Sequence, residues 1–218
     1  MKFKKSSLLV RFFAMAFACA LPVQALAHPH GWIEIRMQLI FDDSGKVSAL
    51  THEWIQDEFT SAYNLEGTDK DGDGKPDRSE LEILAAEFME NLSRENYFLD
   101  IQQEEKLLSM TYGSDASLTL EGLKLNLKFT TKLQNPVSIQ QNALKYAFYD
   151  PTFYIEMLHV EGDKPITLVN APKGCGWELE PPDPNPDLAA YALSLGVNES
   201  GGTSLGQHFA EWATIKCK

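Results

Sequence analysis

A twelve-residue acidic segment, Asp69 to Glu80, carries the most specific chemical pattern in the sequence. Its acidic residues occupy positions one, three, five, nine and twelve of an EF-hand calcium loop, and Gly74 occupies position six. Calcium is a hard cation that takes about six to eight oxygen ligands, and the glycine permits the sharp turn between them. We expect a calcium site with these ligands: the side chains of Asp69, Asp71, Asp73, Asp77 and Glu80, and the main-chain carbonyl of Lys75.

Position eight of this loop is Pro76, which has no amide N–H with which to pair with a sister loop. The sequence contains no second loop of this kind. We therefore expect a solitary structural site with a dissociation constant on the order of 10⁻⁴ to 10⁻³ M, not a sensor that opens on binding. The alternative is a solvated acidic turn that binds no ion.

Two histidines, His28 and His30, form a second candidate metal site, because imidazole nitrogens suit zinc, nickel and copper. If the chain is cleaved after Ala27, the amine of His28 becomes a further ligand. Pro29 excludes the amino-terminal copper and nickel motif, which requires deprotonated amides at positions two and three. The alternative is a frayed, solvated pair at a chain end.

A third group would have to complete such a site, and we expect His52 or a carboxylate such as Glu34. Both share a face with His30 if the first hairpin closes with Asp42 opposite Lys46. The other two histidines are expected to be structural: His159 as a satisfied strand residue, and His208 packed against the C-terminal strand.

The first 27 residues read as a secretory signal peptide. A basic start precedes the apolar run 12–21, which is too short to span a bilayer, and Ala25-Leu26-Ala27 supplies the small residues of a cleavage site. We expect a single periplasmic domain, residues 28–218, which does not span the membrane after cleavage. The alternatives are an N-terminal membrane anchor and a lipoprotein attached through Cys19.

The charge of the chain narrows the class of partner. Its formal net charge of −12 becomes −16 once the four cations of the signal segment are removed. Nucleic acids and anionic lipids are bound by clusters of Lys and Arg, so neither is an expected partner. The acidity is compatible with a protein that meets cations, and equally with plain solubility.

Two cysteines, Cys175 and Cys217, remain after removal of the signal segment. In a compartment where disulfides persist, they are expected to be joined and to tie down the C-terminus. The alternatives are a thiolate metal site and a redox pair, which both favour closer spacing.

The elements expected to position these groups give an α+β fold with a mainly antiparallel β core and an inserted EF-hand-like helix-loop-helix unit at about 57–92. Residues 32–41 alternate apolar and polar side chains and predict a strand, which a turn connects to a second strand at 47–55. Asp57 can cap a short helix at 58–65, and an apolar stripe predicts a second helix at 78–92, on the other side of the acidic loop. Further strands are expected at 117–133, 143–148, 154–159, 166–169 and 212–217, and a short helix at 187–195.

The order of several short motifs resembles a periplasmic family, domain of unknown function 1007. These motifs are His28-Pro-His30-Gly-Trp32-Ile33, Trp54-Ile-Gln-Asp57-Glu58-Phe59, the acidic loop, Tyr149-Asp150-Pro151-Thr152 and the closing Cys217. The resemblance covers essentially the whole mature chain. Members occur beside nickel/cobalt-type permeases, which implies an accessory role in moving divalent transition metals such as zinc, nickel or cobalt.

Three functions therefore remain open. The leading hypothesis is a non-enzymatic periplasmic protein that binds a transition metal for a membrane permease and holds calcium structurally. A copper redox enzyme that uses a histidine brace at His28 is the second. The third is an interaction domain with calcium as its only ion. The sequence has no nucleophile motif and no Gly-rich phosphate loop.

Overall fold

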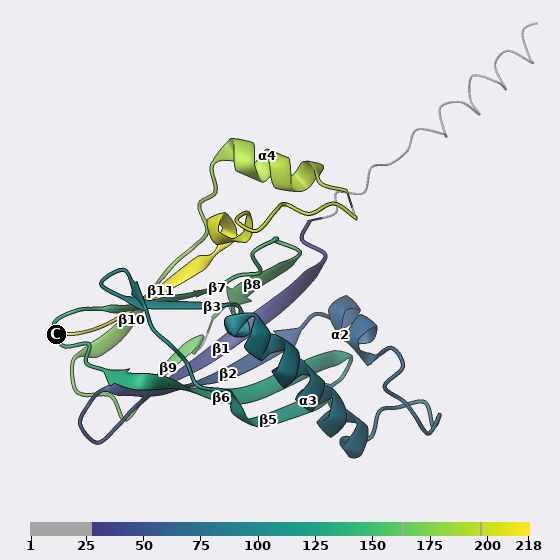
Figure 1. The fold of residues 1–218 in the computed structure, drawn as a ribbon, viewed down its shortest axis with the longest axis horizontal. Coiled ribbons are helices and arrows are strands. Elements are labelled where there is room, and N and C mark those ends of the chain that lie inside the picture. The colour runs from purple at the N-terminus through teal and green to yellow at the C-terminus, as the bar shows by residue number, and fades with distance from the viewer. Residues whose placement is uncertain (1–27, 163, 197) are drawn as a thin grey trace, which may run out of the picture.

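The computed structural model describes residues 28–162, 164–196 and 198–218, and the expected signal peptide lies outside the described residues. Two β-sheets contribute side chains to one hydrophobic core. Figure 1 shows the two sheets one above the other. In the described part of the chain, no helix is both long and apolar enough to cross a membrane.

The first sheet has the strand order β5-β6-β2-β1-β8, and β9 also pairs with β1. Its members are β1 (Gly31–Phe41), β2 (Val47–Gln56), β5 (Ser114–Glu121), β6 (Lys124–Val137), β8 (Ile155–His159) and β9 (Ile166–Val169). The strands from β5 to β1 are antiparallel, as the sequence predicts. In contrast, β8 and β9 run parallel to β1 and follow one another along the same edge, β8 beside residues 31–35 and β9 beside residues 37–40.

The second sheet is antiparallel throughout, with the order β10-β11-β7-β3-β4. Its members are β3 (Leu99–Gln103), β4 (Lys106–Leu107), β7 (Leu144–Phe148), β10 (Cys175–Glu180) and β11 (Glu211–Cys217). The expected disulfide is confirmed: Cys175 and Cys217 are bonded and link the start of β10 to the end of β11. The sequence did not predict β10, because that strand buries no side chain fully and so lacks an alternating pattern.

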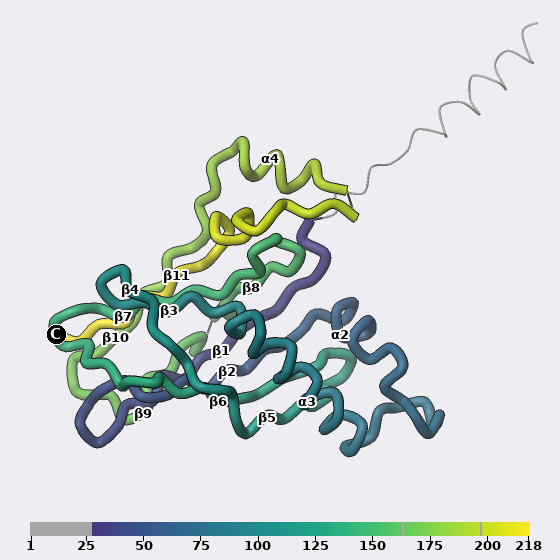
Figure 2. The backbone as a smooth tube through the Cα atoms, in the orientation of Figure 1, coloured from purple at the N-terminus to yellow at the C-terminus, as the bar shows by residue number. Residues whose placement is uncertain are grey.

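Helices α2 (Glu58–Leu65) and α3 (Arg78–Arg94) stand on either side of the acidic loop. The buried stripe of α3 packs near β5 and consists of Leu81, Leu84, Ala85 and Met89. Helix α4 (Pro186–Ser194) lies on the other side of the molecule and shares a small separate core with Phe153 and Leu205 (Figure 2). Two short 3₁₀ turns, η1 (Asn96–Phe98) and η2 (Gly206–Phe209), precede β3 and β11.

Candidate metal centres

Local capping explains where the helices beside the acidic loop begin. The Asp57 carboxylate accepts hydrogen bonds from the amides of Phe59 (2.8 Å) and Thr60 (3.1 Å) at the start of α2. Asp77 and Glu80 form a capping box at the start of α3: each side chain accepts from the other's backbone amide at 2.9 Å. Both helix starts are therefore set by residues within the segment itself.

Three loop carboxylates converge. Ligand oxygens of Asp69, Asp71 and Asp73 all lie within 4.8 Å of one another. The Asp69 carboxylate accepts from the amides of Gly72 (2.8 Å) and Gly74 (2.9 Å), which curls the loop around it. Gly74 has a backbone φ of +91°. Residues with a side chain rarely adopt this conformation, so the turn requires glycine here. These oxygens are of the kind that hard cations prefer.

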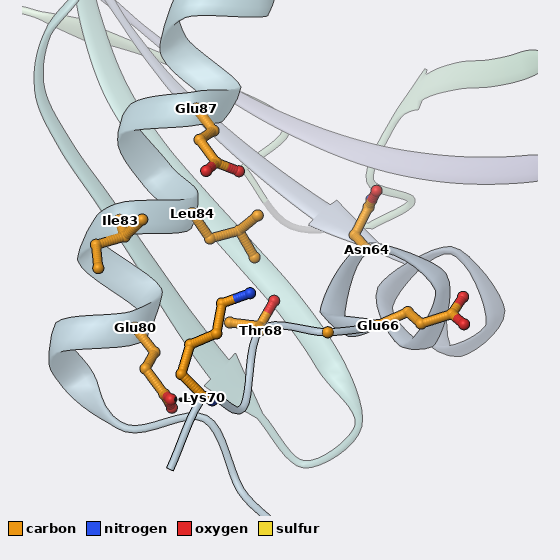
Figure 3. Close-up of a pocket in the computed structure, with 9 residues that line it drawn as sticks. Asn64, Glu66, Thr68, Lys70, Glu80, Ile83, Leu84 and Glu87 are labelled. Atoms are coloured by element: carbon orange, nitrogen blue, oxygen red, sulfur yellow. Dashed lines mark hydrogen bonds between the residues drawn. The ribbon is translucent and has the colours of Figure 1, made fainter. Parts of the chain in front are cut away.

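The structure does not bring every predicted calcium ligand into this cluster. Glu80 is buried, and its two oxygens accept from the amides of Lys70 and Asp77. Figure 3 shows Glu80 reaching from α3 toward Lys70, at the edge of a pocket of about 200 Å³ that Ile83, Leu84 and Thr68 also line. The Asp77 carboxylate acts as a helix cap, and the hydrogen bond from the Glu80 amide together with that from Ser79 lowers its pKa.

The His28 and His30 rings come together with a third ring, that of Tyr154. The ring centroids of the two histidines are 4.8 Å apart, and the Tyr154 ring lies 4.4 Å from His30 and 6.0 Å from His28. The parallel pairing of β1 with β8 produces this arrangement, because the His30 amide donates to the Tyr154 carbonyl at 2.7 Å. Tyr154 was not among the predicted site residues.

Three ring nitrogens in this cluster are buried without a hydrogen-bond partner among the described residues: Nδ1 and Nε2 of His28 and Nε2 of His30. His28 is only 4% exposed. Burial, and then the charge of His28, lower the pKa of His30, which favours the neutral ring that binds metals. Buried polar atoms in proteins are nearly always paired, so such a group of nitrogens calls for an explanation.

The turn before β8 positions Tyr154. The Asp150 carboxylate is buried and accepts from the amides of Thr152 (2.9 Å), Tyr154 (3.0 Å) and Ile155 (3.2 Å). At the same turn, the Phe153 ring stacks on Phe209 at 3.9 Å. The Asp-Pro pair is the sequence signal for this turn. It does not reveal which strand β8 pairs with.

The prediction that His52 shares a face with His30 and Glu34 is wrong. The hairpin does close at Asp42 and Lys46, but a bulge near Phe41 shifts the register by one residue and places His52 opposite Met37. A shift of one residue turns a side chain to the other face of a sheet. His52 is consequently buried in the core, with Nε2 2.8 Å from Thr131 Oγ1.

The remaining candidates are paired with other residues or exposed to solvent. The exposed Glu34 carboxylate forms an ion pair with Lys124 at 3.7 Å. His159 is satisfied as expected, because Nδ1 lies 2.7 Å from Glu211 Oε2 and Nε2 lies 2.9 Å from Tyr146 Oη. His208, which we expected to be packed, is exposed on η2.

Comparison with known proteins places this chain in a family. The family model described as "Protein of unknown function (DUF1007)" matches residues 13–217, nearly the whole chain. The chain belongs to this family. A similar protein, an uncharacterized protein of Haemophilus influenzae, is 26% identical over 196 residues, which cover 88% of this chain and 92% of the relative. The match therefore extends from the His28–His30 pair to the disulfide.

Proposed function

We propose that this DUF1007 protein is an exported metal-binding accessory of a divalent transition-metal transport system, with His28 and His30 as ligands. The observation that carries the proposal is the set of buried, unpaired imidazole nitrogens in two rings 4.8 Å apart. Imidazole is a ligand for zinc, nickel, cobalt and copper, whereas it is a poor one for calcium and magnesium. A bound transition metal would satisfy nitrogens that otherwise carry a desolvation cost.

The half-exposed Tyr154 ring lies beside both histidines, so the proposed site is near the surface although its ring nitrogens are buried. A site near the surface suits a protein that accepts an ion and passes it on better than one that stores it. An integral membrane metal permease is the partner that this role requires. The chain is acidic overall, which favours the approach of cations through long-range attraction.

Isothermal titration with zinc, nickel, cobalt and copper tests the proposal on protein processed in the cell and purified without a histidine tag. We expect one ion per chain for at least one metal, and at least tenfold weaker binding for His28→Ala and His30→Ala. His208→Ala is the matched control, because that histidine is exposed on η2. Equal affinity in all four proteins would refute the assignment.

A form extended by one residue before His28 separates the role of the amine from that of the ring. If the amine is a ligand, the extension weakens binding as strongly as His28→Ala does. If only the rings bind, the extended protein keeps its affinity while both alanine variants lose it. Elemental analysis of protein purified from its native source identifies the metal.

We also propose that the acidic loop binds calcium. The converging oxygens of Asp69, Asp71 and Asp73 support this, and the turn at Gly74 holds them together. Completing the shell requires Glu80 to exchange its hydrogen bonds for the ion. Calcium at millimolar concentration should release or absorb heat and raise the melting temperature, and Asp71→Asn should abolish both effects while Asp43→Asn, in the exposed β1–β2 turn, should not.

A further inference from the structure

A pocket of about 220 Å³ lies outside both candidate metal centres, where η1 enters β3 and meets the end of β7. Phe98 and Leu99 contribute to one side of its lining, and Tyr149 and Pro151 to another. The two sides are tied together by a hydrogen bond from the Tyr149 amide to the Phe98 carbonyl, at 3.0 Å. The pocket walls are therefore fixed by the pairing of β3 with β7.

An incompletely paired carboxylate, that of Asp100, lines this pocket. Its Oδ2 accepts a hydrogen bond from the Tyr149 hydroxyl at 3.3 Å, whereas its Oδ1 is buried and has no partner among the described residues. A carboxylate offers about four acceptor positions, and here the hydroxyl fills one of them. Burial raises the pKa of Asp100 despite that hydrogen bond. The group is therefore short of a positive partner or a donor.

The backbone beside the pocket adopts a costly conformation. Asn96, Tyr97 and Phe98 all have positive φ, at 48°, 56° and 51°, although none of them is glycine. Two hydrogen bonds hold this segment: Asn96 Nδ2 donates to the Leu99 carbonyl at 2.6 Å, and the Gly113 amide donates to the Tyr97 hydroxyl at 2.7 Å. Such strain persists where the surroundings enforce it, and it often occurs at binding sites.

The lining has the chemistry of a cation site with an apolar wall. It contains two carboxylates, those of Glu95 and Asp100, and no Lys, Arg or His residue. The side chain of Leu107, 72% exposed, adds to the apolar side. The aromatic ring of Tyr149 offers a face that attracts cations. A hydrated metal ion would gain nothing from these apolar groups, whereas an organic cation would contact both the carboxylates and the apolar wall.

We propose that this pocket binds a small organic ammonium ion, with its charge at the Asp100 carboxylate and its aliphatic part against Leu107 and Phe98. The pocket, of about 220 Å³, has room for a short aliphatic chain. This pocket shares no residue with the two candidate metal centres, so its proposal is tested independently of theirs.

NMR titration of the full protein with n-butylammonium tests the proposal, and n-butanol of the same chain length serves as the uncharged probe. We expect saturable shifts of the amides of Leu99, Leu107 and Tyr149 at millimolar n-butylammonium, and at least tenfold weaker binding of n-butanol. Asp100→Asn should weaken n-butylammonium binding at least tenfold, because it removes a charge-assisted hydrogen bond. Asp115→Asn, an exposed control on β5, should leave it unchanged.

Leu107→Ser provides a second test at an exposed position that does not threaten folding. It should weaken n-butylammonium binding severalfold through the lost apolar contact. Equal binding of the charged and uncharged probes, no saturable shift at millimolar concentration, or unchanged affinity in both Asp100→Asn and Leu107→Ser would each overturn the proposal.

Discussion

Nε2 of His52 lies 2.8 Å from Oγ1 of Thr131, and this hydrogen bond joins β2 to β6 inside the core. The His52 ring also stacks on Phe129 at a centroid distance of 4.3 Å. No charged partner faces the ring among these contacts, and burial lowers the pKa of His52 to about 3. His52 is thus a structural residue that is kept neutral.

This environment predicts a specific dependence of stability on pH. The unfolded chain protonates His52 near pH 6.5 and the folded protein does so only near pH 3, so stability falls as pH drops through this window. Between pH 7 and pH 5 the loss attributable to His52 is about 2 kcal/mol. Urea unfolding of the protein and of His52→Gln at several pH values measures it. The variant should be less stable at pH 7 and show a flatter slope, and an unchanged slope would contradict the assignment.

The pair formed by Glu211 and His159 should stabilise the contact between the two sheets. Burial would raise the pKa of Glu211, but the hydrogen bonds from the His159 ring and amide and the His159 charge outweigh it and lower that pKa. Glu211→Ala leaves both donors without an acceptor and should cost about 2–4 kcal/mol. Glu211→Gln keeps an acceptor oxygen and should cost less. Chemical unfolding at pH 7 compares them, and equal losses would contradict the prediction by showing that the acceptor oxygen kept in Glu211→Gln contributes nothing.

The same pair adds a second effect of pH. A lowered carboxylate pKa contributes stability above the unfolded value of 4.5, and that contribution is lost as pH falls through the folded value. The difference in stability between the protein and Glu211→Gln should therefore shrink below pH 4.5. A constant difference down to pH 3 would contradict this.

The turn at Asp150 should influence both stability and metal binding. Asp150→Ala removes an acceptor for the amides of Thr152, Tyr154 and Ile155, and should cost about 1–3 kcal/mol. If the His28–His30 site binds a metal, Asp150→Ala should also weaken that binding, because the turn that holds Tyr154 beside the two histidines would move. Thermal unfolding and metal titration measure the two effects. Asp43→Ala, in the exposed β1–β2 turn, should change neither.

The disulfide should stabilise the C-terminal sheet. Cys175 and Cys217 are separated by 42 residues, and loss of a cross-link over that length costs about 3–4 kcal/mol by the loop-entropy argument. The double variant Cys175→Ser, Cys217→Ser should unfold at correspondingly lower urea concentration, and a reductant should lower the stability of the parent protein alone. Equal stability of both proteins without reductant would contradict the prediction.

Strand faces and helix starts could be predicted from the sequence, because residues close together in the chain determine them. The alternation along β1 predicts a half-buried strand, and the structure buries Ile33, Ile35 and Met37 on one face as expected. The cap residue Asp57 likewise predicts the start of α2, and its side chain accepts the amides of the first helical turn. The disulfide was predictable from the number of cysteines in the expected mature chain.

What only the tertiary structure decided involves residues that are distant in sequence. One bulge between β1 and β2 moves His52 from the predicted His30 face into the core, and the apolar pattern cannot reveal it because His52 fits either face. The approach of Tyr154 to His30 depends on β8 pairing in parallel with β1 across more than a hundred residues. Periodicity gives the face of a strand but not its neighbour, since strand order is chosen by burial over the whole chain.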